Sequence, residues 1–232
     1  MNGLAGARVP SSISSAREAG FSIRTALDSL RKTSGVEAVA VADGMPIDFD
    51  YRIFRVAPKG STEFVSSHVT RIGENYLETI GAKLVRGRTI SSEDRLTDAR
   101  VAVISEPLAT LLFPGAEAVG ETVVTTLEEG KDIEYTVVGV SADFATSQLT
   151  TERPQIMLPL PESLTPTVHL IVRGAAGDEP KLKAALESAL RELGVEPLPG
   201  VAFPGIVTGQ DLLDKSLGDL VSESTAVGVA GG

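Results

Sequence analysis

The chain has 232 residues, of which 42% are hydrophobic and 4% aromatic, and it carries a formal net charge of −10. The hydrophobic share is close to that of ordinary globular proteins, so it predicts a folded, mainly aliphatic core and argues against disorder. The negative charge repels phosphate backbones and no cluster of Lys and Arg offsets it, which makes nucleic acid an unsuitable partner. Cysteine is absent, which excludes disulfides, thiolate metal sites and a cysteine nucleophile.

No stretch approaches the roughly 20 apolar residues that span a bilayer. The N-terminus also lacks the charged start and apolar run of a secretory signal. These features suit a cytosolic protein, but the small residues at both ends, including the final AVGVAGG, equally suit a piece cut from a longer chain. Composition leaves both interpretations open.

Hydrophobic periodicity in the first third predicts two helices and three strands. The first helix is expected over 14–33, where apolar residues recur at helical spacing and Gly35 follows as a stop. The second helix is expected at Glu74–Ile80, where Gly81 follows as a stop. The three strands are expected at Val36–Ala42, Arg52–Ala57 and Phe64–Thr70, and a PKGS turn joins the last two into a hairpin.

The middle of the chain predicts a β-rich block. A strand over Arg100–Ile104 is followed by Ser105, which can cap a helix that Pro114 and Gly115 end. Two further strands, joined by a polar EEGKD turn, are expected at Glu121–Leu127 and Ile133–Val140.

The last third returns to strand, helix and strand. The strongest helix is expected over Asp178–Leu193, because its leucines and alanines form one apolar stripe. Strands are expected at Gln155–Leu158, Thr167–Arg173 and Val201–Thr208, and a final amphipathic helix at Gln210–Ser224. The pattern as a whole predicts an α+β fold, with similar helix and strand units on either side of the middle block.

Motifs for chemistry are absent. A phosphate-binding P-loop would need Ser or Thr after Gly130-Lys131, where Asp132 stands, so ATP chemistry must lie elsewhere. The string from Gly139 to Asp143 lacks the second Gly of a nucleophile elbow. The two histidines, His68 and His169, each stand alone in an alternating strand pattern. No catalytic, cofactor-binding or metal-binding residue is therefore predicted, and no cofactor.

Acidic pairs occur at 93–94, 128–129 and 178–179. None has the spacing of a calcium loop. The first is expected to open or cap a turn, the second to lie in a hairpin tip, and the third to begin a helix, where acidic groups suit the helix dipole. All three predict solvated structural roles.

Residues 71–123, followed by EYTVVGVSADF and RPQIMLPL, resemble the periplasmic core domain of MacB-type permeases, and most closely the acidobacterial-style group of duplicated permeases. LRKTSGVEAVAVADGMPI at Leu30–Ile47 resembles the family as well, although Ser34 replaces its usual Pro. The residues that match the family pattern, called the signature residues below, are Tyr76, Gly81, Gly87, Arg88, Asp94, Glu106, Phe113, Gly120 and Gly139.

The signature residues suit structural roles better than a reactive site. The glycines fit turns, helix ends or close backbone approach. Arg88 and Asp94 could form a charged pair between the first half and the middle block, and Phe113 could end a helix by burying its ring before a proline.

The resemblance implies a division into two subdomains. A Porter-like unit would combine residues 14–90 and 155–226, and a β-rich Sabre-like unit would be inserted at 91–154. The helix over 14–33 would continue from one membrane helix, and the helix over 210–224 would lead into the next. The chain would thus be the periplasmic part of an inner-membrane protein, anchored by transmembrane helices outside this sequence.

The resemblance also implies a non-enzymatic function. In MacB-like permeases, an ATPase domain or subunit in the cytoplasm drives a permease dimer, whose external domains pass the motion to cargo or to a periplasmic adaptor protein. This process is called mechanotransmission and typically serves efflux. An alternative is an FtsX-like docking domain that switches a partner such as a cell-wall hydrolase. A third interpretation, a free-standing enzyme, requires a deep polar pocket near His68 or His169.

Overall fold

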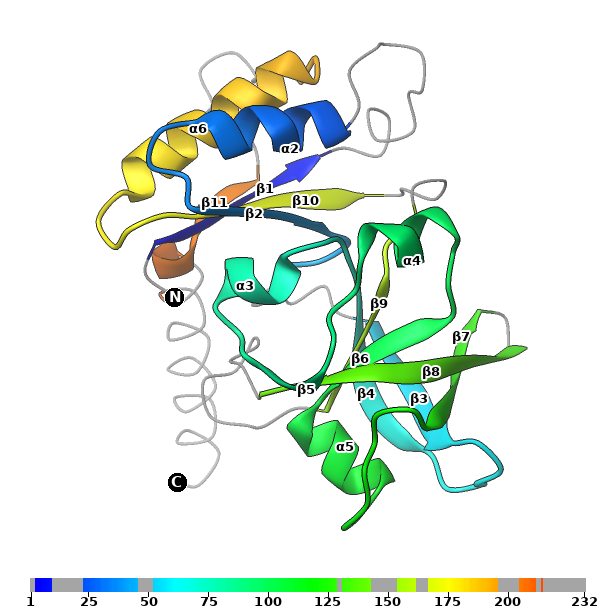
Figure 1. Ribbon diagram of the computed structural model, residues 1–232. Helices are drawn as coiled ribbons and strands as arrows, with labels where there is room; N and C mark the ends of the chain where they lie inside the picture. The colour runs from blue at the N-terminus through cyan, green and yellow to red at the C-terminus, as the bar shows by residue number, and fades with distance from the viewer. Residues whose placement is uncertain are drawn as a thin grey trace, which may run out of the picture.

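The computed structural model describes residues 3–9, 23–45, 52–128, 131–142, 154–161, 167–195, 205–211 and 214. Figure 1 shows two stacked parts, an α/β layer at the top and a β-barrel below it. The helices are α2 (Ile23–Lys32), α3 (Tyr76–Ile80), α4 (Ser92–Leu96), α5 (Glu106–Leu112) and α6 (Glu179–Glu192). The strands are β1 (Leu4–Val9), β2 (Ala38–Ala42), β3 (Arg52–Pro58), β4 (Val65–Ile72), β5 (Leu84–Gly87), β6 (Val101–Ser105), β7 (Thr122–Glu128), β8 (Lys131–Ser141), β9 (Gln155–Pro159), β10 (Val168–Arg173) and β11 (Ile206–Thr208).

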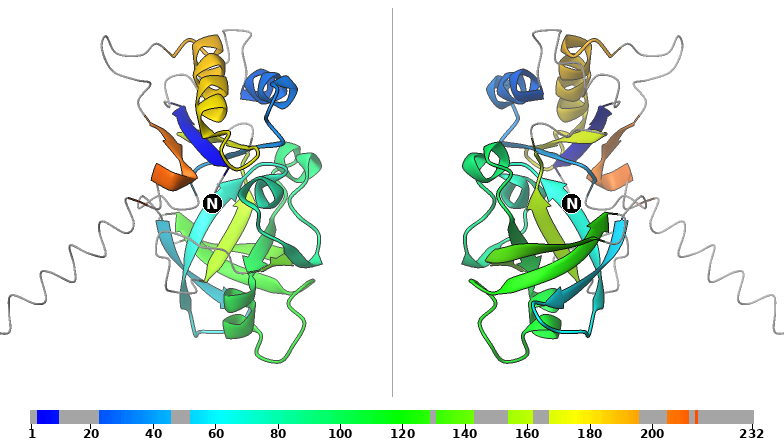
Figure 2. Two further views of the ribbon diagram at one scale, coloured as in Figure 1. Left: turned by 90° about the vertical axis from the view of Figure 1, so that its left-hand side faces the viewer. Right: turned by 90° about the vertical axis from the view of Figure 1, so that its right-hand side faces the viewer.

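The α/β layer is an antiparallel sheet in the order β11-β1-β10-β2. Helices α2 and α6 lie side by side on one face of this sheet, as Figure 2 shows, and α3 lies on the other. Apolar side chains on the inner faces of α2 and α6, such as Leu30 and Leu186, are fully buried against alternate strand residues, such as Val41 and Leu170. The helical stripe and the strand alternation read from the sequence thus meet in one core.

The lower part is a closed ring of six strands in the order β4-β3-β7-β8-β6-β9. Parallel pairing of β4 with β9, for example of Val69 with Ile156, closes the ring. Alternation places Ala102 and Ile104 of β6 in the barrel interior, whereas Val103 belongs to a different core cluster. Helix α5 packs on the interior cluster at the bottom of Figure 1. Closure leaves none of these six strands as a bare sheet edge.

A shared hydrophobic cluster joins the two parts. It combines Ala40 and Ile171 from the upper sheet, Tyr76 from α3, and Val103 and Met157 from the outer face of the barrel. One residue pair, Ala42 with Ile72, makes the two parts a single continuous sheet.

Most elements lie where the sequence predicts them, and the α+β class is confirmed. Three elements were not predicted: β1, β5 and α4. The strand β1 consists of LAGARV, whose small residues give little hydrophobic contrast, yet it lies between β10 and β11. The expectation that the first helix continues directly from a membrane helix is wrong, because β1 precedes α2 and belongs to the sheet. The expected helix at 210–224 falls largely outside the described residues.

The subdomain division at residues 91 and 154 stays a prediction. Hydrogen bonding places β3, β4 and β9 in the same ring as β6, β7 and β8, although the expected division assigns the first three strands to the Porter-like unit. The backbone N–H and C=O groups along β4 and β9 find hydrogen-bond partners on strands that are distant in the sequence. Local patterns in the sequence do not reveal these partners.

Candidate functional site

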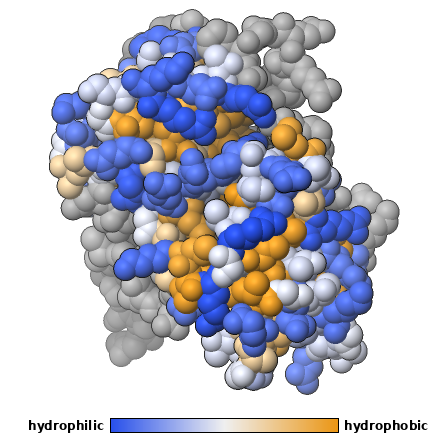
Figure 3. All heavy atoms as spheres, in the orientation of Figure 1, coloured by the Kyte–Doolittle hydropathy of each residue, from blue (hydrophilic) through white to orange (hydrophobic). Residues whose placement is uncertain are grey.

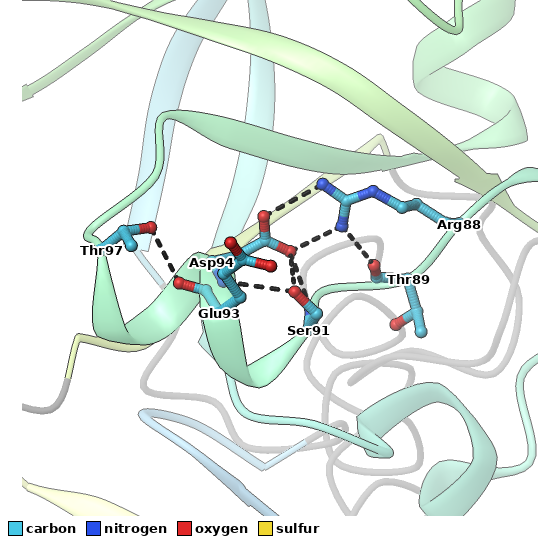
Figure 4. Close-up of polar contacts among 6 residues, drawn as sticks. All are labelled: Arg88, Thr89, Ser91, Glu93, Asp94 and Thr97. Carbon is cyan, nitrogen blue, oxygen red and sulfur yellow. Dashed lines mark hydrogen bonds and ion pairs between the residues drawn. The ribbon is translucent and has the colours of Figure 1, made fainter.

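Arg88 and Asp94 form the charged pair that the sequence suggested (Figure 4). The guanidinium donates Nη1 to Oδ2 at 2.6 Å and Nη2 to Oδ1 at 3.0 Å. Ser91 donates its backbone N–H and its hydroxyl to Oδ2, both at 2.8 Å, and accepts from the Asp94 N–H at 3.2 Å. This reciprocal arrangement is a capping box that begins α4. Asp94 is therefore a structural residue that fixes both a helix end and the chain leaving β5.

The environment of Asp94 makes its charge matter for stability. The hydrogen bonds from Arg88, followed by those from Ser91, outweigh burial and lower the pKa of Asp94 to about 2, from an ordinary value of 3.8. Because the folded state lowers this pKa, the stabilisation is complete above about pH 4 and is lost as the pH falls toward 2.

We expect Asp94→Asn to lower the free energy of unfolding at pH 7 by about 1–3 kcal/mol. The loss is modest because half of the Arg88 side chain is exposed, so solvent screens its attraction to Asp94. The difference from the parent protein should shrink between pH 4 and pH 2, which urea unfolding at several pH values would measure. The control is Asp28→Asn, which removes an exposed pair with Arg31 at 2.7 Å and should cost less than about 0.5 kcal/mol. Equal losses in the two variants would contradict the role of Asp94.

Gly87 and Gly139 face each other across β5 and β8. A Cβ on Gly87 would lie 2.2 Å from the Val138 carbonyl oxygen, and one on Gly139 would lie 2.2 Å from the Arg88 carbonyl oxygen. Gly87 also has a φ of 73°. The two backbones can approach this closely only without side chains at both positions.

Strand β5 relies on that backbone pairing, because all four of its residues are exposed. Leu84 and Val85 are the exposed large hydrophobic residues of β5. Figure 3 shows hydrophobic surface on the lower half of the face that it draws. Because side-chain packing does not hold β5 in place, the close backbone pairing at Gly87 and Gly139 positions Arg88 for its ion pair with Asp94.

Tyr76 and Gly81 belong to α3, away from this pair. Tyr76 is buried in the shared cluster, and burial raises the pKa of its hydroxyl. Gly81 ends α3 in the left-handed region, with a φ of 78°. Arg173 at the end of β10 donates Nε to the Thr79 carbonyl, and a Cβ on Gly81 would lie 2.9 Å from its guanidinium. These contacts hold α3 under the upper sheet.

The other signature residues surround α5. Glu106 is its first residue, after Ser105, which accepts from the Leu108 N–H as predicted. Phe113 follows the last turn and packs against the barrel cluster. Gly120, with a φ of 95°, donates its N–H to the Val137 carbonyl at 2.8 Å just before β7. The structure therefore distributes the signature residues over three places, and only Gly87, Arg88, Asp94 and Gly139 lie together.

Arg95 was not singled out from the sequence, yet it links the two parts. Its guanidinium donates Nη1 to Oε2 of Glu74 at 2.7 Å and Nε to the Leu160 carbonyl at 2.8 Å. It thus ties α4 to the chain before α3 and to the end of β9. The spacing of Ser91 and Asp94, typical of a capping box, is a local signal that could have indicated α4. Nothing in the sequence indicated partners 21 and 65 residues away.

The two histidines are not brought together. His169 pairs with Ala42, which in turn pairs with Ile72, and His68 lies four residues, about 13 Å, before Ile72 on β4. Neither histidine lines the pocket of about 190 Å³ at one end of the barrel. That pocket does not supply the site that the enzyme interpretation requires. Within the described ranges, no three His, Asp or Glu side chains are grouped to hold a metal ion.

Among the helices that the structure describes, each is too short or too polar to cross a bilayer. A search of curated proteins finds no match.

Comparison with solved structures shows a similar fold. The periplasmic region of MacB from Actinobacillus actinomycetemcomitans matches with a TM-score of 0.58 and 14% identity, over 92% of each chain. The extracellular domain of the noncanonic ABC-type transporter YknZ from Gram-positive bacteria matches with a TM-score of 0.54 and 17% identity, over 83% of this chain and 95% of that one. A domain of a putative permease protein from Porphyromonas gingivalis matches with a TM-score of 0.52 and 16% identity, over 82% of this chain and 83% of that one.

The family comparison covers most of the chain. The model of the MacB-like periplasmic core domain matches residues 6–190, a range that contains every signature residue. The chain therefore belongs to the family of MacB-like periplasmic core domains, the extracytoplasmic domains of ABC transporter permeases.

Proposed function

We propose that this domain transmits ATP-driven movement of a membrane-embedded permease dimer to cargo or to a periplasmic adaptor. A cytoplasmic ATPase would supply the energy, and the domain itself would carry out no reaction. In this proposal the domain lies on the periplasmic side of the inner membrane and acts as a stiff body. Transmission of this kind requires that a displacement of one part move the other by a similar amount.

The observation that carries the proposal is the shared core between the two parts. The shared cluster takes buried residues from the upper sheet, from α3 and from the barrel. Close-packed interiors deform little, so they pass displacements on instead of absorbing them. The continuous sheet through Ala42 and Ile72 and the Gly73 N–H bond to the Val41 carbonyl, at 2.7 Å, support the same conclusion.

Arg95 adds a polar connection that water screens little. Its pair with Glu74 is largely buried, so loss of the guanidinium would leave a partly buried carboxylate and the Leu160 carbonyl without this donor. The connection joins α4 at the barrel to the segment that enters α3. We therefore expect Arg95→Met to loosen the barrel against the upper layer without removing either part.

The test uses the complete permease with its ATPase, spin-labelled either at Leu111→Cys on the barrel or at Lys32→Cys on α2. In the parent protein, nucleotide should shift the distance between the two copies of each label. With Arg95→Met, the Leu111 distances should broaden while those at Lys32 still shift. The control is Lys59→Met, which removes an exposed pair of similar length, 2.8 Å to Glu134, and should change neither distribution.

An absence of any nucleotide-dependent shift at both labels would contradict transmission. It would favour the docking function instead, in which the domain binds and switches a periplasmic partner such as a cell-wall hydrolase. A broadening with Lys59→Met equal to that with Arg95→Met would remove the special role of the Arg95 connection.

A further inference from the structure

The pocket of about 190 Å³ lies at the end of the barrel opposite α5. Strands β4 and β9 end there, and β6 begins there. Two arginines, Arg71 and Arg100, line it together with one acid, Asp98. The rest of the lining is apolar or aromatic: Ala99, Ile133, Tyr135, Leu158, Pro159 and Pro161. The pocket therefore combines a net positive charge with a smaller apolar wall, to which the partly exposed side chains of Ile133 and Tyr135 contribute.

The pocket is positively charged, although the chain as a whole is negative. The side chains of Arg71, Arg100 and Asp98 give the pocket a net charge of +1, whereas the whole chain carries a formal net charge of −10. Within the part of the chain that the structure describes, the Arg100 guanidinium makes no hydrogen bond or ion pair. Arginine binds carboxylates through two parallel hydrogen bonds, which suits it to an anionic ligand.

The apolar wall narrows the class of anion. A bare inorganic anion gains nothing from the partly exposed side chains of Ile133 and Tyr135, whereas an aliphatic group would be removed from water against them. The pocket is also smaller than the roughly 300–1,000 Å³ of most small-molecule sites. It therefore suits a group about the size of one amino-acid side chain.

The backbone around the pocket is held in place before any ligand binds. Asp43 fixes Arg71 in both directions: its Oδ1 accepts from the Arg71 N–H at 2.7 Å, and its own N–H donates to the Arg71 carbonyl at 3.0 Å. The Arg100 carbonyl accepts from the Thr136 N–H at 2.9 Å, and the Ala99 N–H donates to the Asp94 carbonyl at 2.8 Å. Such pre-organisation reduces the entropy lost on binding.

We propose that this pocket binds a carboxylate carried on a short aliphatic group, with Arg100 as the principal partner of the carboxylate. The carboxylate comes either from a free small acid or from the C-terminal end of a protein chain. The proposal stands apart from mechanotransmission, since it concerns the isolated domain and does not depend on nucleotide.

The test is a ¹H–¹⁵N NMR titration of this chain with isovalerate, with N-acetyl-leucine and with inorganic phosphate. We expect both carboxylates to shift the amides of Ala99, Arg100, Ile133 and Tyr135. Arg100→Gln should weaken binding about tenfold, because it removes one charge-assisted pair. Asp98→Asn should strengthen binding a few-fold, since it removes the nearby negative charge. Arg86→Gln, at another exposed arginine, should leave the affinity unchanged.

The three probes separate the outcomes. Tighter binding of N-acetyl-leucine than of isovalerate would indicate a chain terminus as the source, and equal binding would indicate a free acid. Phosphate binding as tightly as either carboxylate would overturn the proposal, because the apolar wall would then play no part. Unchanged affinity with Arg100→Gln, in a protein whose spectrum shows the native fold, would overturn it as well.

Discussion

Replacing Gly87 with alanine is expected to destabilise the domain by about 3 kcal/mol or more. Two costs add at this position. The added Cβ meets the Val138 carbonyl oxygen at 2.2 Å, so β5 and β8 must move apart. The φ of 73° also places an L-residue in the left-handed region, at a cost of about 1–2 kcal/mol. Urea unfolding followed by circular dichroism would measure the loss.

The matched control is Gly115→Ala. Gly115 has nearly the same φ, 74°, but a Cβ there meets nothing within 4 Å. Its variant should lose only the conformational cost, about 1–2 kcal/mol. The difference between the two variants isolates the close approach of β5 and β8, and equal losses would show that this approach contributes nothing. Gly139→Ala, which meets the Arg88 carbonyl oxygen at 2.2 Å without the positive φ, should fall between them.

Replacing Tyr76 with alanine is expected to cost about 3–5 kcal/mol. Its ring is buried between the upper sheet and the barrel, so truncation opens a cavity that surrounding residues from both parts cannot fill without moving. Because the cluster is common to both parts, they should still unfold together in one transition at a lower urea concentration. Unfolding followed by far-ultraviolet circular dichroism and by tyrosine fluorescence, which in this variant comes from Tyr51 and Tyr135, would check whether the transitions coincide.

Two variants control for the size and place of the Tyr76 effect. Tyr76→Phe keeps the ring and should cost less than about 1.5 kcal/mol. Leu96→Ala removes an apolar side chain that is 61% exposed and should change stability by less than about 0.5 kcal/mol. Two separate transitions in Tyr76→Ala would mean that the barrel and the α/β layer are independent folding units, which would weaken the proposed stiff coupling.

Local patterns in the sequence were sufficient for most elements and for some contacts. The apolar stripe of Asp178–Leu193 became α6, with its leucines in the core, because a 3.6-residue period identifies the buried face of a helix. The Arg88–Asp94 pair could also be anticipated, because its opposite charges lie only six residues apart along the chain. The capping role of Ser105 was likewise foreseen from its local position before the helix.

The ring of the barrel was not foreseen, although its strands were. Pairing of β4 with β9 joins residues nearly ninety positions apart, for example His68 with Gln155. Periodicity indicates that a strand has a buried face, but it does not name the neighbour that satisfies each edge. The division that the family resemblance implies, which stays a prediction, assigns β9 and the β3–β4 hairpin to a different unit from β6, β7 and β8.

Composition and periodicity alone therefore established an α+β domain without a recognisable reactive motif, and the resemblance identified its family. Which charged residues matter was decided only by the folded arrangement. Arg95 finds its partners at Glu74 and Leu160. Arg71 on β4 and Arg100, just before β6, line one pocket. Contacts within one turn follow from the local spacing of residues. The contacts of Arg95 and the lining of the pocket depend instead on how distant strands pair and on where the chain passes between the α/β layer and the barrel.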